Sequence, residues 1–303
     1  MVIRLSHLSS RMTTPGRYGR GTGFLRRVRR AGFVRAGLAL TVLVSAGCAG
    51  RAPIGVGERQ EVIDRITSAS VKVTLDKDGR RLGSGSGVVV ASRIEGPRAE
   101  AVSYVLTAQH VFDGKDGSVI LVHLAGLNAA RVKKLPATLY RKGNAETLDL
   151  ALLRVPGIAV IPAQFPDDND VRLGEEILVV GFPWGKRLGI FGGIISQVPV
   201  DAASGGPTEE GTEQTIVVDA SSAKGVSGGG VFREATGRLL GIVEGYQTAS
   251  IAVEGRTQNY SVKVPMPGET FVVPIGRIRR FVDDAGLGNG LGRVRDSGDR
   301  KEE

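Results

Sequence analysis

A single serine stands among glycines in the second half of the chain. The stretch reads KGVSGGGVF at residues 224–232, so Ser227 has a glycine two residues before it and three glycines directly after it. Glycines crowd a serine when the backbone must turn sharply and its N–H groups must point at a reacting group. The same residues would also suit a glycine-rich hairpin turn that has no catalytic role. A base and an acid elsewhere in the chain would favour Ser227 as a nucleophile.

The candidate base is found by elimination among three histidines. His7 belongs to an arginine-rich leader, and His123 lies in the alternating run LVHL, where a structural strand histidine is the simpler interpretation. His110 directly follows an apolar strand pattern, in LTAQH. A strand end holds a side chain rigidly and still lets it face a cleft. We therefore expect His110 to be the general base.

Asp149 is the candidate acid because it interrupts an apolar run, LDLALL at residues 148–153. A carboxylate inside such a strand is costly unless it is paired, and a nearby imidazole would explain its presence. The alternative is an aspartate at a strand edge that faces solvent. If the pairing holds, Asp149 would orient His110, and His110 would activate Ser227.

The charge of the chain is concentrated in its leader. Nine of the 40 basic residues are arginines within residues 1–47, which contain no acid, and the other 31 basic residues equal the 31 acids. The body is therefore neutral and has no basic stripe for a phosphate backbone. This distribution argues against a nucleic-acid partner.

The leader also carries an apolar run, residues 36–47, that ends at Cys48. Twelve residues are too few for a membrane-spanning helix, but a basic segment before a short apolar one is typical of a secretory signal. The end of the run resembles a bacterial lipobox, which implies lipidation of Cys48 and a membrane anchor on the periplasmic side of the envelope. An ordinary signal peptide cleaved nearby is the alternative, and a twin-arginine signal fits poorly.

Cys48 is the only cysteine, so the chain forms no internal disulfide and no cysteine-based zinc site. Clusters of His, Asp and Glu at ligand spacing are also missing from the sequence. We therefore set a metal-dependent hydrolase aside and expect no metal or other cofactor.

From residue 70 onward the sequence consists of short apolar runs separated by turn residues, which predicts an all-β fold of antiparallel barrels or a sandwich. Helices are expected only over residues 58–67 and after Pro274, where apolar residues recur at helical spacing. The expected organisation is a signal peptide (1–47), a tether (48–57), one folded domain (58–285) and a disordered tail (286–303).

Three motifs together resemble the triad motifs of trypsin-like serine proteases: TAQH at 107–110, DLALL at 149–153 and GVSGG at 225–229. Further stretches, such as GSGSG at 83–87 and GFPWG at 181–185, resemble the bacterial HtrA-like, or Deg, branch. The resemblance covers about residues 65–285. It implies two six-stranded antiparallel β-barrels with the active site between them, a serine endopeptidase that acts on polypeptides, and no room in this chain for the PDZ domain often found in that branch.

The resemblance also assigns roles at the site. His110, Asp149 and Ser227 would form the catalytic triad, and the N–H groups of Gly225 and Ser227 would form the oxyanion hole. Substrate would bind along β-structure that contains Glu244, Gly245 and Tyr246. Ser221 would form the floor of the specificity pocket, and its small uncharged side chain implies small or medium apolar residues before the cut.

Three residues depart from the digestive members of the family. Val226 replaces the aspartate that pairs with a freed N-terminus, Gly230 replaces a proline, and Glu244 replaces a serine. Activation by that kind of cleavage is therefore not expected. The departures leave an alternative open, a catalytically silent relative that binds peptides or proteins through the same cleft.

Overall fold

The computed structural model describes residues 56–124, 133–144, 147–167, 171–199, 215–253 and 260–288. All of these residues belong to one compact unit, residues 53–303. The leader, Cys48, most of the tether and nearly all of the expected tail lie outside the described residues.

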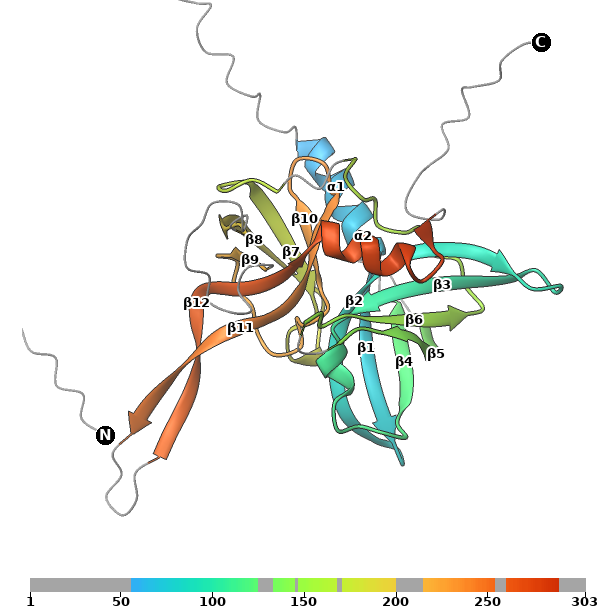
Figure 1. Ribbon diagram of the computed structural model, residues 1–303, viewed down its shortest axis with the longest axis horizontal. Coiled ribbons are helices and arrows are strands. Elements are labelled where there is room, and N and C mark those ends of the chain that lie inside the picture. The colour runs from blue at the N-terminus through green and yellow to red at the C-terminus, as the bar shows by residue number, and fades with distance from the viewer. Residues whose placement is uncertain are drawn as a thin grey trace, which may run out of the picture. The chain divides into compact units, whose positions relative to one another are not determined.

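Six antiparallel strands close into a first barrel, and six more close into a second (Figure 1). The first barrel has the spatial order β1-β2-β3-β6-β5-β4, and the second has the order β10-β11-β12-β9-β8-β7. The expectation of two six-stranded antiparallel barrels is confirmed. The strands of the first barrel are β1 (Ser70–Lys77), β2 (Arg80–Glu95), β3 (Glu100–Thr107), β4 (Val119–Leu124), β5 (Lys133–Lys142) and β6 (Ala151–Pro156). Those of the second are β7 (Glu176–Gly181), β8 (Gly189–Gln197), β9 (Ile216–Val218), β10 (Gly230–Arg233), β11 (Leu239–Val253) and β12 (Tyr260–Pro274).

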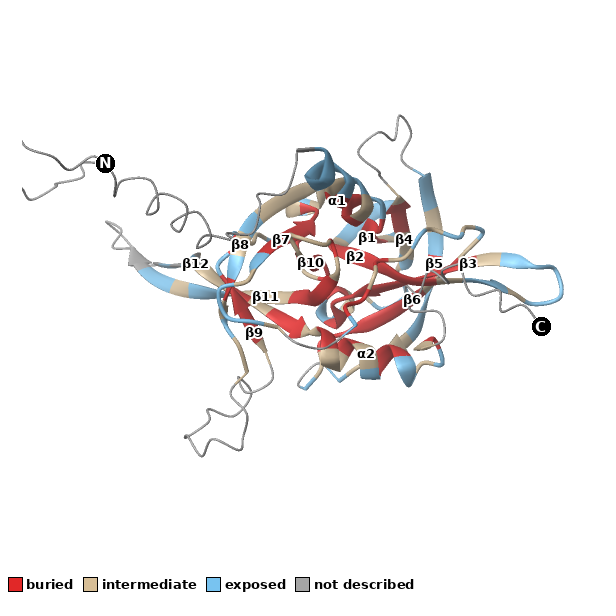
Figure 2. Cartoon of the chain, turned by 90° about the horizontal axis from the view of Figure 1, so that it is seen from above, coloured by how far each residue is buried: buried red, intermediate tan, exposed pale blue. Residues whose placement is uncertain are grey.

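Side chains point alternately into and out of each barrel along its strands, and the inward ones fill the core. In β1, Val71 and Val73 are fully buried while Lys72 between them is only partly buried, as expected of a strand with one face toward a core. A third apolar cluster joins the barrels, because strands of both contribute to it (Figure 2). Its members include Val88, Leu106, Leu152, Val180, Phe232 and Ile242.

Two α-helices pack against this shared cluster. α2 (Ile275–Asp283) follows Pro274 as expected and buries Ile278, Phe281 and Val282. α1 (Val56–Ser68) covers the predicted segment 58–67 and buries Val62 and Ile66. Short 3₁₀ turns, η1 (Gln109–Phe112) and η2 (Pro183–Gly185), follow β3 and β7. No helix among the described residues is long and apolar enough to cross a membrane.

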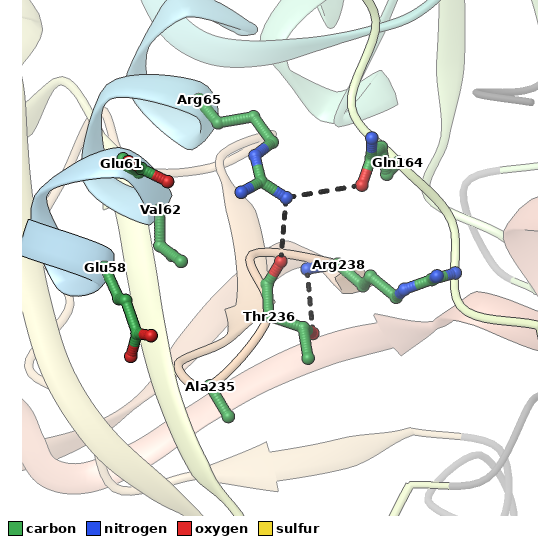
Figure 3. A pocket seen from close by; sticks show the side chains of 8 residues that line it. All are labelled: Glu58, Glu61, Val62, Arg65, Gln164, Ala235, Thr236 and Arg238. Carbon is green, nitrogen blue, oxygen red and sulfur yellow. Dashed lines mark hydrogen bonds between the residues drawn. The ribbon is translucent and has the colours of Figure 1, made fainter. Parts of the chain in front are cut away.

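α1 is tied to the turn between β10 and β11. The Arg65 guanidinium donates to the Thr236 carbonyl at 3.2 Å and to Gln164 Oε1 at 3.4 Å, on the wall of a surface pocket of about 460 Å³ (Figure 3). Gln164 lies in the segment between the barrels, so α1 connects that segment to the second barrel. The helix therefore fastens the junction of the two barrels from one side.

Several expected boundaries differ from the structure. The strand expected from residue 148 begins at Ala151, because the Leu150 N–H donates to the Leu148 carbonyl in a local turn rather than to a neighbouring strand. β10 was not predicted, since glycines at its start hide the strand pattern. Leu287, in the expected tail, is buried, and its N–H donates to the Val282 carbonyl at the end of α2.

Candidate active site

His110 and Asp149 meet because β3 and β6 are neighbours. Thr107 at the end of β3 pairs with Ala151 at the start of β6, so the residues just beyond these two positions lie side by side. The His110 Nδ1–H donates to Asp149 Oδ2 at 2.6 Å, and the His110 backbone N–H donates to Oδ1 at 2.8 Å. Asp149 therefore fixes both the ring and the backbone of His110, and Nε2 is left as the acceptor.

The burial of the two side chains differs. Asp149 is only 5% exposed, whereas 43% of the His110 side chain is exposed. The carboxylate thus lies in the first barrel behind a histidine that reaches the surface. The hydrogen bond that His110 donates to Asp149 raises the pKa of His110 above its usual value, burial opposes this, and the charges of Asp149, Asp113 and Glu244 add to the increase. A base whose protonated form is stabilised in this way suits acceptance of a proton from a nucleophile.

Ser227 lies on a loop of the second barrel that touches the first. The Ser86 N–H in β2 donates to the Ser227 carbonyl at 2.8 Å. Gly228, with φ of +82°, comes so close that an added Cβ would lie 2.2 Å from the Ser86 carbonyl oxygen and 2.8 Å from the Ala108 nitrogen. Since Ala108 is two residues from His110, this contact brings Ser227 beside the His110 turn.

The side chains of Ser227 and His110 share no hydrogen bond in the described part of the chain. Serine–histidine hydrogen bonds of this kind are often long without substrate and tighten in the reacting complex. The arrangement therefore places the candidate nucleophile and the candidate base on neighbouring parts of the two barrels.

The backbone N–H groups of the Ser227 loop differ in whether they have an acceptor within the described part of the chain. The N–H groups of Val226, Gly228 and Gly229 each donate to a backbone carbonyl, whereas those of Gly225 and Ser227 donate to no acceptor among the described residues. Two unengaged donors on either side of one residue suit an oxyanion. The two donors that the resemblance assigns to an oxyanion hole are thus among those that the described residues leave available.

Ser86 holds this loop from the first barrel. Its buried Oγ donates to the Gly225 carbonyl at 2.7 Å and accepts from the Phe182 N–H at 2.8 Å. Gly225, with φ of +97°, has no space for a side chain, because an added Cβ would lie 2.7 Å from the Phe182 carbonyl oxygen. The loop is therefore held at Gly225 as well as at Gly228, although Gly230 replaces a proline.

Glu244 faces the His110–Asp149 pair from β11. It directly follows Val243, whose N–H and carbonyl bond with Gly229 and Gly228. Burial raises the pKa of Glu244, the charge of Asp149 raises it further, and the charges of Arg277 and His110 oppose this. Glu244 was expected among the substrate-binding residues, and the structure adds that its charge acts on His110 and is itself affected by Asp149.

The other expected substrate residues also belong to the second half of the fold. Gly245 and Tyr246 follow Glu244 in β11 and are partly buried, while Ser221 is exposed in the segment between β9 and the Ser227 loop. His123 is separate from this site: it is buried in β4 and its Nε2 bonds Thr74 Oγ1 at 2.9 Å.

Two contributors to the site were not predicted. Ser86 was noted only as part of a glycine-rich stretch, although a polar residue between two glycines at the start of a buried valine run was a usable signal. Arg277 of α2 donates to the Thr147 carbonyl, two residues before Asp149, and its charge acts on Glu244. The described residues contain no group of His, Cys, Asp and Glu that could hold a metal ion.

Comparison with known proteins now identifies the family. The sequence profile described as "Trypsin-like peptidase domain" matches residues 85–242, more than half of the chain, and this range contains His110, Asp149 and Ser227. The chain belongs to this family.

Among curated proteins, this trypsin-like peptidase domain is similar to serine proteases. It is 30% identical over 189 residues to a Brucella suis protein named "Probable periplasmic serine endoprotease DegP-like", covering 61% of this chain and 31% of that protein. It is 24% identical over 296 residues to "Serine protease PepD" of Mycobacterium tuberculosis, covering 86% of this chain and 60% of that protein. The chain thus spans about a third to three fifths of the length of these relatives.

Among solved structures, the fold is similar to that of a serine endoprotease from Yersinia pestis. The TM-score is 0.54 at 21% sequence identity, with 75% of this chain and 66% of the other covered. At this identity the likeness concerns the fold. It agrees with the two closed barrels described above.

Proposed function

We propose that this trypsin-like peptidase domain is a serine endopeptidase that cleaves proteins of the cell envelope or secreted proteins. Its support is the hydrogen bond of 2.6 Å between His110 Nδ1 and Asp149 Oδ2, together with the nearby Ser227 loop, in which the Gly225 and Ser227 N–H groups have no acceptor among the described residues. The family match and the serine protease relatives agree with this activity.

In the proposed reaction, Ser227 Oγ attacks the peptide carbonyl while His110 Nε2 accepts its proton. The N–H groups of Gly225 and Ser227 bind the oxyanion, and His110 then donates the proton to the leaving amine as the acyl-enzyme forms. Water, activated by the same histidine, releases the acid product and restores Ser227. Asp149 holds the ring and stabilises its protonated form without taking the proton.

A fluorophosphonate probe tests this activity directly, because it reacts with an activated serine. We expect the full chain, purified in detergent at neutral pH, to be labelled, and Ser227→Ala to abolish labelling and to lower peptidase turnover by about 10⁶-fold. The control is Ser70→Ala, which removes a buried serine bonded to the Ile66 carbonyl. A folded protein that binds peptides but is never labelled would favour the alternative, a silent peptide-binding relative.

We also propose export to the periplasm and lipidation at Cys48. Two relatives are named as periplasmic serine proteases, and the leader has the composition of a signal peptide. Metabolic labelling with palmitate should mark the wild-type chain and not Cys48→Ser. Equal labelling of the two, or none of either, would contradict the lipid anchor.

A further inference from the structure

β11 and β12 continue beyond the second barrel as a two-stranded arm (Figures 1 and 2). In the arm, Thr248 to Val253 of β11 pair with Pro265 to Tyr260 of β12. Exposed residues in this part of β11 include Thr248, Ser250 and Ile251. The arm therefore carries β-structure out from the barrel toward solvent.

One edge of β11 in the arm has no partner strand. β10 pairs with β11 only from Leu239 to Ile242, while β12 occupies the other edge as far as Val253. Among the described residues, no strand pairs with the outer edge from Glu244 onward. This open edge begins beside Ser227, because Val243 exchanges hydrogen bonds with Gly228 and Gly229.

Pro265 indicates which residues of the arm direct their backbone groups away from the partner strand. Thr248 lies opposite Pro265, and since proline has no N–H, these two residues cannot exchange a pair of hydrogen bonds. Pairs in an antiparallel ladder alternate between bonded and non-bonded positions. Thr248, Ser250 and Ala252 therefore direct their backbone N–H and carbonyl groups toward the open edge.

The two edges of the arm differ in chemistry. On β12, Lys263 and Pro265 lie at positions whose backbone groups point away from β11. The first is charged, the second is a proline, and Pro267 follows two residues later. Charges and prolines are the features that keep an edge strand from pairing with another chain. Residues 245–253 of β11 contain neither. The β12 edge is thus protected, whereas the β11 edge is complete in donors and acceptors.

We propose that the β11 edge from Thr248 to Ala252 binds an unfolded stretch of the substrate as an added antiparallel strand, and so extends the cleft beyond Tyr246. This inference rests on the proposed peptidase function. Because β11 runs away from Ser227, an antiparallel peptide enters at the tip of the arm and reaches Ser227 at its carboxyl end. The arm therefore holds residues that precede the scissile bond.

Such an edge selects for an extended backbone more than for particular side chains, since most of its contacts are main-chain hydrogen bonds. Most strands of a folded protein already have partners on both sides, and its edge strands are usually protected by charges or prolines. The arm accordingly favours unfolded or loosened polypeptides, whose backbone groups are not already paired.

The test measures peptide binding to the Ser227→Ala full chain in detergent, so that it does not depend on turnover. Fluorescent peptides share the same residues next to the scissile bond and extend either about four or about ten residues before it. We expect the long peptide to bind about tenfold more tightly than the short one. N-methylation of alternate amides in the distal half of the long peptide should remove this gain.

Two matched variants locate the contact, because Ser250 and Lys263 lie directly opposite each other in the arm. The backbone N–H at each position points away from the partner strand. Proline at either position therefore leaves the hydrogen bonds between β11 and β12 in place. Ser250→Pro, on the open edge, should bind long and short peptides equally. Lys263→Pro, on the protected edge, should keep the tenfold gain.

Equal binding of long and short peptides by the unsubstituted arm would overturn the proposal, as would a gain that survives both N-methylation and Ser250→Pro. If Ser250→Pro misfolds, the N-methylated peptide still decides. Self-association that Ser250→Pro abolishes without affecting the peptides would show that a second copy of the chain occupies the edge instead. A length gain in a protein that the fluorophosphonate probe never labels would contradict the peptidase function and leave the edge as a polypeptide-binding surface.

Discussion

At the scale of single residues, carboxylates from both barrels act on one imidazole. Asp149 bonds His110 directly, while Glu244 acts through its charge from the facing barrel. The pKa of Glu244 is itself raised, first by burial and then by Asp149. The protonation of the candidate base therefore depends on a residue that makes no hydrogen bond with it.

Replacement of Glu244 by glutamine should shift the pH dependence of activity. Loss of the negative charge lowers the pKa of His110, so the base stays unprotonated to lower pH. The acidic limb of kcat/KM against pH should therefore move to lower pH. Asp167→Asn, which removes a carboxylate that pairs with Arg238, is the control and should leave the limb in place. An unmoved limb in Glu244→Gln would show that Glu244 does not act on the base.

The sequence identified candidate residues where type and local pattern were enough. One histidine after a strand, one aspartate in an apolar run and one serine among glycines pointed to His110, Asp149 and Ser227. The contribution of Ser86 depends on a hydrogen bond across 139 positions to Gly225, and no local pattern encodes such a contact. The effect of Glu244 on His110 likewise depends on how β11 faces the first barrel.

At the scale of elements, the Ser227 loop joins the two barrels through glycine. Gly228 lies against both β2 and the end of β3, with Thr107 Oγ1 2.4 Å from the position that a Cβ would occupy. The Thr107 hydroxyl in turn donates to the Ser86 carbonyl at 2.6 Å. The contact needs a residue without a side chain and with positive φ.

Gly228→Ala should therefore disturb both folding and activity. The added methyl group clashes with backbone atoms, and alanine is strained at φ of +82°, so we expect a loss of about 3 kcal/mol or more in the free energy of unfolding. Urea denaturation and the rate of fluorophosphonate labelling measure the two effects. Gly192→Ala, where an added Cβ meets nothing within 4 Å, is the control and should change little. Wild-type labelling by Gly228→Ala would contradict the tight junction.

Elements with a clear apolar period were predictable, and those with glycine or irregular ends were not. Both helices and most strands followed from spacing alone. β10 was missed because it begins with a glycine after two others, and the start of β6 was misplaced because Leu148 and Leu150 bond to each other locally. The part of β12 that begins at Tyr260 was predicted from its alternating apolar residues, whereas β11 was expected to end at Val243 and continues to Val253.

At the scale of the whole molecule, two histidines respond to acid in opposite directions. Burial lowers the pKa of His123 to about 4, and the charges of Lys72, Arg81 and Lys134 contribute. Between about pH 6.5 and about pH 4, the unfolded chain binds a proton at His123 and the folded chain does not. His123 therefore makes the fold less stable as the pH falls through this window.

His123→Gln should weaken the dependence of the free energy of unfolding on pH. Urea unfolding at about pH 7.5 and about pH 5 should show a smaller loss of stability on acidification than in the wild type. His110→Gln is the informative contrast, because the raised pKa of His110 gives stability that is present below about pH 6.5 and is lost as the pH rises. Its removal should make the acid loss larger. The same slope in all three proteins would contradict both assignments.

Because the residues of the candidate site come from both barrels, the site can form only after both barrels have been synthesised. His110 and Asp149 belong to the first half of the fold, whereas Ser227 is held by Val243 of β11, far later in the chain. A ribosome makes the first barrel while the serine loop and the strand that anchors it are still missing. If the proposed roles hold, the newborn chain has its base before its nucleophile, and we expect a truncated product that stops before β11 to lack peptidase activity.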